Sequence, residues 1–239
     1  MASLLLKNAR LVNEGEIRDA DVLIAGDRIE RIGASLAAPD NAEVIDLDGK
    51  YLLPGMIDDQ VHFREPGLVH KGDLASESAA AAAGGITSFM DMPNVNPQTT
   101  TRAAIRDKYA VAANRCTANY GFHFGATNGN IEEIKALQVG EASGIKAFMG
   151  ASTGDMLVDN PETLERLFEH APLIVLTHCE DSPMIWENEA QARQKFGEDV
   201  PFSEHPRIRP AEACLASSQL AVSLASRHDA LLHVLHLTT

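Results

Sequence analysis

Short bursts of alternating apolar and polar residues fill the first fifty positions of the chain. They predict four strands, at residues 4–12, 21–24, 29–32 and 44–47. The dipeptides Gly-Asp at 26–27 and Asp-Gly at 48–49 are typical turn signals between such strands. We therefore expect a small antiparallel β module over residues 1–53 and interpret it as part of a β-sandwich.

Beyond residue 53 the pattern changes to nearly continuous apolar strands that alternate with helical segments. The expected strands are residues 55–63, 87–92, 120–126, 145–148, 173–177 and 231–237. The expected helices are residues 73–83, 101–113, 131–137, 161–170 and 210–227. This alternation favours a parallel sheet covered by helices. Residues 180–210, which are acidic and polar and end in a stretch with three prolines, are expected to form a long loop above a strand end.

Composition narrows the classes of function. The 239 residues carry a formal net charge of −14, which argues against a nucleic-acid or anionic-membrane surface and leaves small-molecule substrates open. No stretch approaches the ~20 apolar residues of a membrane span. Three widely spaced cysteines argue against a disulfide framework and against a four-thiolate zinc site. We expect a soluble protein of the reducing cytoplasm.

Candidate metal chemistry lies at the ends of the expected strands. His62, His178 and His236 each end a strand, and Lys146 lies within another. A lone histidine at a strand end is most often structural; three at equivalent ends favour ligation of a metal ion when the motifs around them also resemble those of a metal-binding family. An amine on a buried apolar strand is unfavourable unless it is modified, neutralised or paired. The other six of the nine histidines are expected to be structural.

The motifs around these residues resemble those of a known family. The run Gly-Met-Ile-Asp-Asp-Gln-Val-His-Phe-Arg-Glu-Pro-Gly at 55–67 resembles the first-strand signature of cyclic amidohydrolases, most closely dihydroorotases. Asp-Met-Pro-Asn-Val-Asn-Pro at 91–97, Gly-Ile-Lys-Ala-Phe-Met-Gly at 144–150 and His-Cys-Glu-Asp at 178–181 follow in the order of that family. Strand alternation and resemblance together predict an α/β fold, a (β/α)8-type TIM barrel over residues 54–239 with about six strands present.

The resemblance implies a zinc site with one or two ions. By position, His62 would bind the first ion, while His178 and His236 would bind the second. Lys146 would bridge the two ions as a carbamate formed with carbon dioxide. Gln60 replaces the first imidazole of the family pattern, so the first site would be weakened, empty or filled by another ion. Asp58 would either orient His62 or cap the strand end, and both alternatives stay open.

The resemblance also implies the reaction. It would be the reversible zinc-dependent cyclisation of N-carbamoyl-L-aspartate to L-dihydroorotate in de novo pyrimidine biosynthesis. Arg64 and Asn94 match the positions that bind the substrate carboxylate, a task that suits the planar fork of a guanidinium. A surface salt bridge from Arg64 to Glu65 or Asp91 is the alternative. Family members commonly form dimers or larger complexes, so a homo-oligomer is expected.

One family residue has no counterpart in the sequence. The aspartate that acts as general base ends the eighth barrel strand, which would lie beyond Thr239, so we interpret the chain as a fragment that is inactive alone. Two other functions stay open. The first is a hydantoinase or allantoinase, which the Arg-Glu-Pro run disfavours. The second is a catalytically impaired structural partner of aspartate carbamoyltransferase, for which Gln60 is the main support.

Overall fold

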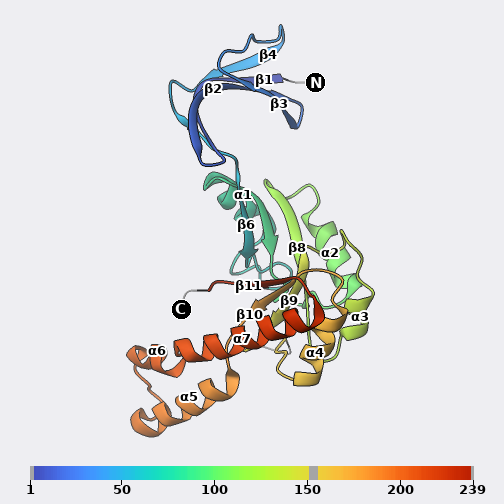
Figure 1. Cartoon of the computed structure of the whole chain (residues 1–239), viewed down its shortest axis with the longest axis vertical. Coiled ribbons are helices and arrows are strands. Elements are labelled where there is room, and N and C mark those ends of the chain that lie inside the picture. Colours follow the sequence, from blue (N-terminus) through green and yellow to red (C-terminus); the bar gives the residue numbers. More distant parts are fainter. Residues whose placement is uncertain (1–2, 151–155, 238–239) are drawn as a thin grey trace. The chain divides into compact units, whose positions relative to one another are not determined.

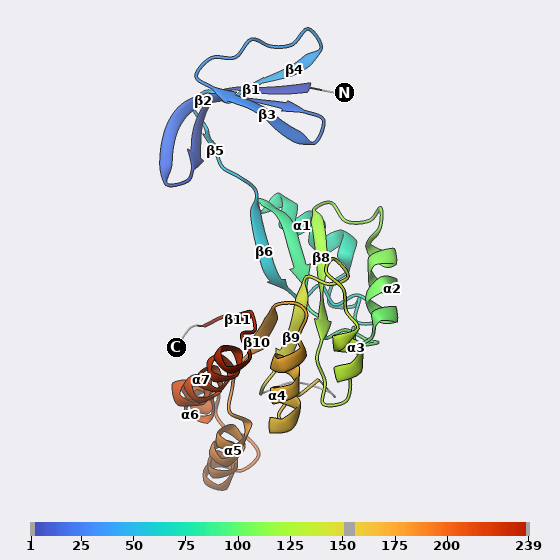
Figure 2. The ribbon, with the colours of Figure 1, turned by 45° about the vertical axis from the view of Figure 1, so that its right-hand side comes forward.

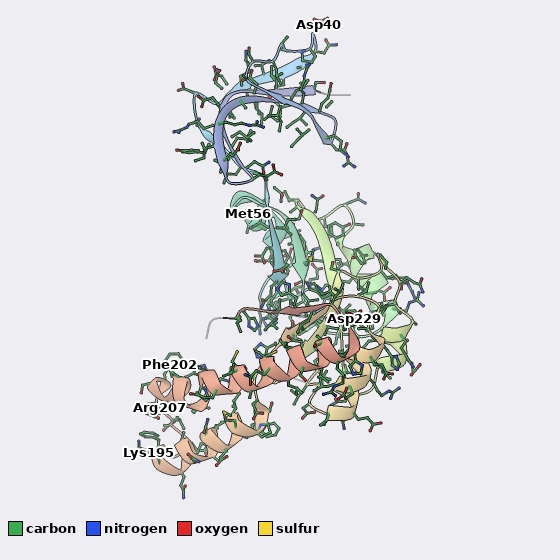
Figure 3. All side chains as sticks on the ribbon, in the orientation of Figure 1. Asp40, Met56, Lys195, Phe202, Arg207 and Asp229 are labelled. Carbon is green, nitrogen blue, oxygen red and sulfur yellow. The ribbon has the colours of Figure 1, made fainter. Side chains whose placement is uncertain are left out.

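The computed structural model describes residues 3–150 and 156–237, and the chain divides into two compact units, Met1–Met56 and Ile57–Thr239. Met56, the last residue of the first unit, is labelled in Figure 3. Among the described residues, no helix is both long and apolar enough to cross a membrane.

The N-terminal unit is a five-stranded mixed sheet. Its strands are β1 (Ser3–Asn13), β2 (Glu16–Ala25), β3 (Arg28–Gly33), β4 (Ala42–Asp46) and β5 (Tyr51–Leu52). The order is β3-β2-β1-β4, with β5 also paired to β1. The expected antiparallel pairing holds for β1 with β2 and for β2 with β3. It is wrong for β4 and β5, which run parallel to β1, because residues 34–41 carry the chain back to the far side of β1 before β4 begins (Figure 1).

A buried carboxylate links β2 to an irregular point of β1 and to the connection that leads to β4. Asp21 on β2 is 3% exposed. Its two oxygens accept the backbone N–H groups of Asn8 and Leu36, each at 2.9 Å. Asn8 lies where the register of β1 shifts, and Leu36 lies in the connection that leads to β4. Both hydrogen bonds stabilise the ionised carboxylate and hold the pKa of Asp21 below its usual value, and the bond from Leu36 has the larger effect.

The C-terminal unit is built on six parallel strands that form half of a barrel. They are β6 (Met56–Val61), β7 (Ile86–Asp91), β8 (Asn119–Gly125), β9 (Gly144–Phe148), β10 (Val175–His178) and β11 (Leu232–Val234), adjacent in that order. The central strand β9 is buried along its whole length. The predicted α/β class and the six barrel strands are confirmed.

Helices between the strands cover the sheet, as the alternation predicts. They are α1 (Leu74–Ala83), α2 (Arg102–Ala112), α3 (Ile131–Lys135), α4 (Pro161–His170) and α7 (Ala211–His228). Figure 2 shows α2 and α3 beside β8. Side chains at their starts satisfy free backbone N–H groups: Asp73 accepts from two amides of α1, and Thr101 accepts from one amide of α2.

The segment at 180–210 is largely helical, which corrects the expected long loop. It contains α5 (Ser182–Phe196), the short 3-10 turn η1 (Phe202–Glu204) and α6 (His205–Ile208). Asp181 caps α5 by accepting the amide of Met184 at 2.9 Å, and a proline follows at the start of the helix. Lys195, Phe202 and Arg207 lie around the turn between α5 and α6 (Figure 3).

Candidate metal and substrate site

The parallel sheet brings the predicted ligands to one edge. His62 directly follows β6, Lys146 lies within β9, His178 ends β10, and His236 lies two residues beyond β11. Since all six strands run in one direction, their carboxyl ends meet at the same edge of the half-barrel. The pairing of Thr177 with Val234 sets the register that makes His178 and His236 neighbours.

His178 and His236 are in direct contact. Nδ1 of His178 lies 3.0 Å from Nε2 of His236, and the rings meet edge to face with centroids 4.8 Å apart. Two nitrogens that each lie ~2.05 Å from one tetrahedral zinc ion are about 3.3 Å apart. Burial lowers the pKa of both imidazoles, which favours the neutral form that ligates metals. The pair therefore fits a shared metal ion with a shift of a few tenths of an ångström.

Lys146 is the most unusual group at this edge. Its side chain is 1% exposed, its Nζ has no hydrogen-bond partner among the described residues, and the amine lies 4.4 Å from the centroid of the Phe148 ring. Burial lowers the pKa of Lys146 to about 7. Its charge also lowers the pKa values of His62, His178 and His236, so all three imidazoles lie within its electrostatic reach. An unpartnered, partly neutral amine has the chemistry that a carbamate bridge requires.

His62 faces the amide of Asn94 in the loop after β7. The two side chains meet at 2.9 Å through Nδ1 of His62 and Oδ1 of Asn94. An amide oxygen only accepts, so Nδ1 of His62 carries the proton and Nε2 keeps a lone pair. Burial and the nearby charge of Arg64 lower the pKa of His62. The contact leaves the amide N–H groups of Asn94 able to donate to a ligand.

The first-strand motif has a local contact of its own. Asp58, within β6, accepts the backbone N–H of Gln60 at 3.0 Å, and this contact does not decide between the two roles considered for it. Across the described residues, no group of three or more His, Cys, Asp or Glu side chains is gathered to hold a metal ion. The predicted ligand set includes a lysine, which is not among these four residue types. The second ion would have three protein ligands only if Lys146 joins His178 and His236.

Arg64 is available to a ligand because the neighbouring carboxylates are already paired. Glu65 lies 2.7 Å from Arg115, and Asp91 lies 2.7 Å from Lys108, so neither forms the salt bridge to Arg64 that the sequence left open. Arg64 has a φ of 70°, a left-handed conformation that destabilises a non-glycine residue by roughly 1–3 kcal/mol. Such backbone strain often occurs where a side chain must be aimed at a ligand.

The sequence analysis missed a carboxylate at the site. Oε2 of Glu180 lies 2.7 Å from Nε2 of His178, on the side of the ring opposite His236. The spacing His-x-Glu after a strand was the available signal, since the residue two positions after a strand-end histidine can fold back onto the ring.

Comparisons with known proteins agree with this geometry. No family model matches the chain. It is 36% identical over 243 residues to a dihydroorotase of Methanosarcina acetivorans and 33% identical over 242 residues to an allantoinase of Deinococcus radiodurans. These matches cover 100% and 99% of this chain but 51% and 53% of the relatives, so the chain spans about half of their length. An L-hydantoinase (dihydropyrimidinase) structure from Arthrobacter aurescens matches with a TM-score of 0.91 and 28% identity, over 98% of this chain and 52% of that one.

Proposed function

Because this chain belongs to the cyclic amidohydrolase superfamily, we propose that it is the N-terminal part of a zinc-dependent dihydroorotase. The reaction is the reversible cyclisation of N-carbamoyl-L-aspartate to L-dihydroorotate. The observation that carries the proposal is the placement of Arg64, free of its neighbouring carboxylates, beside the edge where His62, Lys146, His178 and His236 converge.

The metal-binding residues divide between two positions. In this proposal His178 and His236 would hold one ion and His62 the other, and Lys146, modified as a carbamate, would be shared between them. Zinc, when bound, polarises the ring amide carbonyl and lowers the pKa of water to about 7. Asn94 orients His62 by accepting its Nδ1–H. Gln60 offers only a neutral amide oxygen, so the proposal includes a weaker first position.

The positive charge of Arg64 matches the negative charge of the proposed substrate. Dihydroorotate carries a carboxylate on its ring, and Arg64 donates two parallel hydrogen bonds to it. Asn94 supports the same group through its amide N–H groups. The aspartate that moves the proton belongs, in this proposal, to the half of the protein that lies beyond the present sequence. The complete polypeptide acts in the cytoplasm, where its thiols stay reduced, and assembles as a homo-oligomer.

A hydantoinase or allantoinase is the second candidate. It is favoured by the similarity to an allantoinase and to an L-hydantoinase structure, both at levels of identity near that of the dihydroorotase. Their ring substrates lack the carboxylate of dihydroorotate, so they would leave Arg64 without a role. A catalytically impaired partner of aspartate carbamoyltransferase rests on Gln60 alone, and such a protein has no need of an unpartnered buried amine at Lys146.

Ring opening of dihydroorotate, hydantoin and allantoin by the complete polypeptide tests the proposal. We expect turnover of dihydroorotate above the other two. Arg64→Ala removes two charge-assisted hydrogen bonds to the carboxylate, which we expect to lower kcat/KM for dihydroorotate about 100-fold. The same change should leave any residual turnover of hydantoin nearly unaltered. Arg166→Ala, which removes an exposed arginine paired with Glu132, is the matched control.

Two results would contradict the assignment. Preferred turnover of hydantoin or allantoin would replace the substrate. An equal loss of kcat/KM for all three substrates in the Arg64 variant would show that Arg64 does not bind the substrate carboxylate. The carbamate is tested separately by 13C NMR after incubation with 13C-labelled bicarbonate and zinc: a carbamate carbonyl signal is expected, and Lys146→Met should abolish it.

A further inference from the structure

The contacts of Glu180 determine which nitrogen of His178 is free. Its Oε2 lies 2.7 Å from Nε2 of His178, while Nδ1 of the same ring lies 3.0 Å from Nε2 of His236. An ionised carboxylate only accepts hydrogen bonds, so the ring nitrogen facing it carries the proton. Nδ1 of His178 is then left with its lone pair directed toward His236.

The surroundings hold Glu180 in this position. Nη2 of Arg209, from the segment before α7, lies 3.5 Å from the same carboxylate oxygen. The backbone of Glu180 is so close to Gly150 that a Cβ at position 150 would lie 2.1 Å from the Glu180 carbonyl oxygen. The next amide, that of Asp181, donates to the carbonyl oxygen of Ala213 at 3.0 Å. Gly150 and Ala213 therefore fix the backbone around Glu180, and Arg209 contacts its carboxylate.

We propose that Glu180, anchored by Arg209, is a positioning residue that holds His178 in the tautomer and orientation needed to bind the metal ion through Nδ1. The inference rests on the proposed metal site and adds to it a residue that contacts neither metal nor substrate. A carboxylate behind a ligating imidazole fixes the ring and makes its free nitrogen more basic. Without it the ring could place its proton on Nδ1, the nitrogen that faces His236.

Metal binding and histidine tautomer are measured in the same set of variants of the complete polypeptide. The first readout is the zinc Kd from competition with a chelating indicator. The second is the 15N shift of the His178 ring nitrogens in the metal-free protein, assigned by comparison with His178→Gln. The variants are Glu180→Ala, Glu180→Gln and Arg209→Met. Glu189→Ala, at an exposed carboxylate of α5 paired with Arg193, is the control.

Glu180→Ala is expected to weaken zinc binding about 10- to 100-fold and to shift the His178 ring away from the Nε2–H tautomer. Glu180→Gln keeps an acceptor oxygen without the charge, so its Kd should rise less than that of Glu180→Ala. Arg209→Met should give a smaller loss, and Glu189→Ala none.

A zinc Kd within twofold of the unchanged protein in Glu180→Ala, with the tautomer unaltered, would overturn the inference. A lower thermal stability in that variant without a change in tautomer or Kd would assign Glu180 a purely structural role and would also overturn it. If the unchanged protein binds no zinc, the proposed function fails instead. The tautomer of metal-free Glu180→Ala then still decides whether Glu180 orients His178.

Discussion

The buried ion pair between Asp91 and Lys108 offers a quantitative test of how the site edge is held together. Oδ2 of Asp91 lies 2.7 Å from Nζ of Lys108, and the side chains are 0% and 1% exposed. The other oxygen of Asp91 accepts the backbone N–H of Phe63 at 2.8 Å, and Lys108 donates to the backbone oxygen of Met92 at 3.0 Å. The pair thus joins helix α2 to the ends of β6 and β7, where the site lies.

Lys108→Met leaves the Asp91 carboxylate buried without its counter-charge. Burial already holds the pKa of Lys108 below its ordinary value, while Asp91 opposes that shift. Removing one member of a buried ion pair lowers the free energy of unfolding by about 3–5 kcal/mol, and we expect this loss for Lys108→Met and for Asp91→Asn. The double variant removes both charges, so its loss should be at least ~1 kcal/mol smaller than the sum of the single losses.

Urea unfolding of the complete polypeptide, followed by circular dichroism, measures all three variants. Arg166→Met, which breaks an exposed pair with Glu132, is the control and should change the free energy of unfolding by less than ~1 kcal/mol. Single losses below ~1 kcal/mol, or single losses that simply add in the double variant, would refute the reasoning. Either result would mean that the two charges do not interact in the buried position described.

Three further expectations concern separate parts of the chain. Gln60→His restores an imidazole to the first-strand motif and should raise the zinc stoichiometry in elemental analysis; an unchanged stoichiometry would show that position 60 faces no metal ion. The pKa of Asp21 is lowered in the folded state, mainly by the hydrogen bond from the Leu36 amide. The ionised carboxylate therefore stabilises the folded state above pH ~4, and this stabilisation is lost as the pH falls through the folded pKa. Acid titration of unfolding should therefore be steeper in the unchanged protein than in Asp21→Asn, and equal slopes would contradict this. Gly150→Ala forces a methyl group against the backbone of Glu180 and should lower both the melting temperature and zinc affinity, whereas unaltered values would show that the contact relaxes freely.

The strands of the barrel were predictable because strands buried between layers consist largely of apolar residues, which are visible in the sequence. β9 is buried at all five positions, and β8 and β10 are buried over most of their length, so a short apolar stretch marks each of these strands in the sequence. Helix α5 was missed for the opposite reason. Only Ser182, Ile185 and Ala192 are buried among its fifteen residues, so it lacks a clear apolar stripe. Its capping aspartate and the following proline were the local signals that could have identified it.

The direction of the strands in the N-terminal sheet could not be predicted from the pattern of apolar residues. Alternation of apolar and polar residues shows which side chains share a face, but it is the same for a parallel and an antiparallel neighbour. The direction of β4 and β5 beside β1 depends on the path of the connecting residues 34–41. Only the folded chain decides that path.

The sequence by itself determined the alternation of strands and helices and the chemical groups that end the strands, since hydrophobic periodicity and residue type are local properties. The tertiary structure decided which of those groups meet. The contact of His178 with Glu180, the pairing of Asp91 with Lys108 and the absence of a hydrogen-bond partner for Lys146 among the described residues depend on distances across the sheet. Such distances follow from register and packing between segments far apart in the chain, which no local pattern encodes.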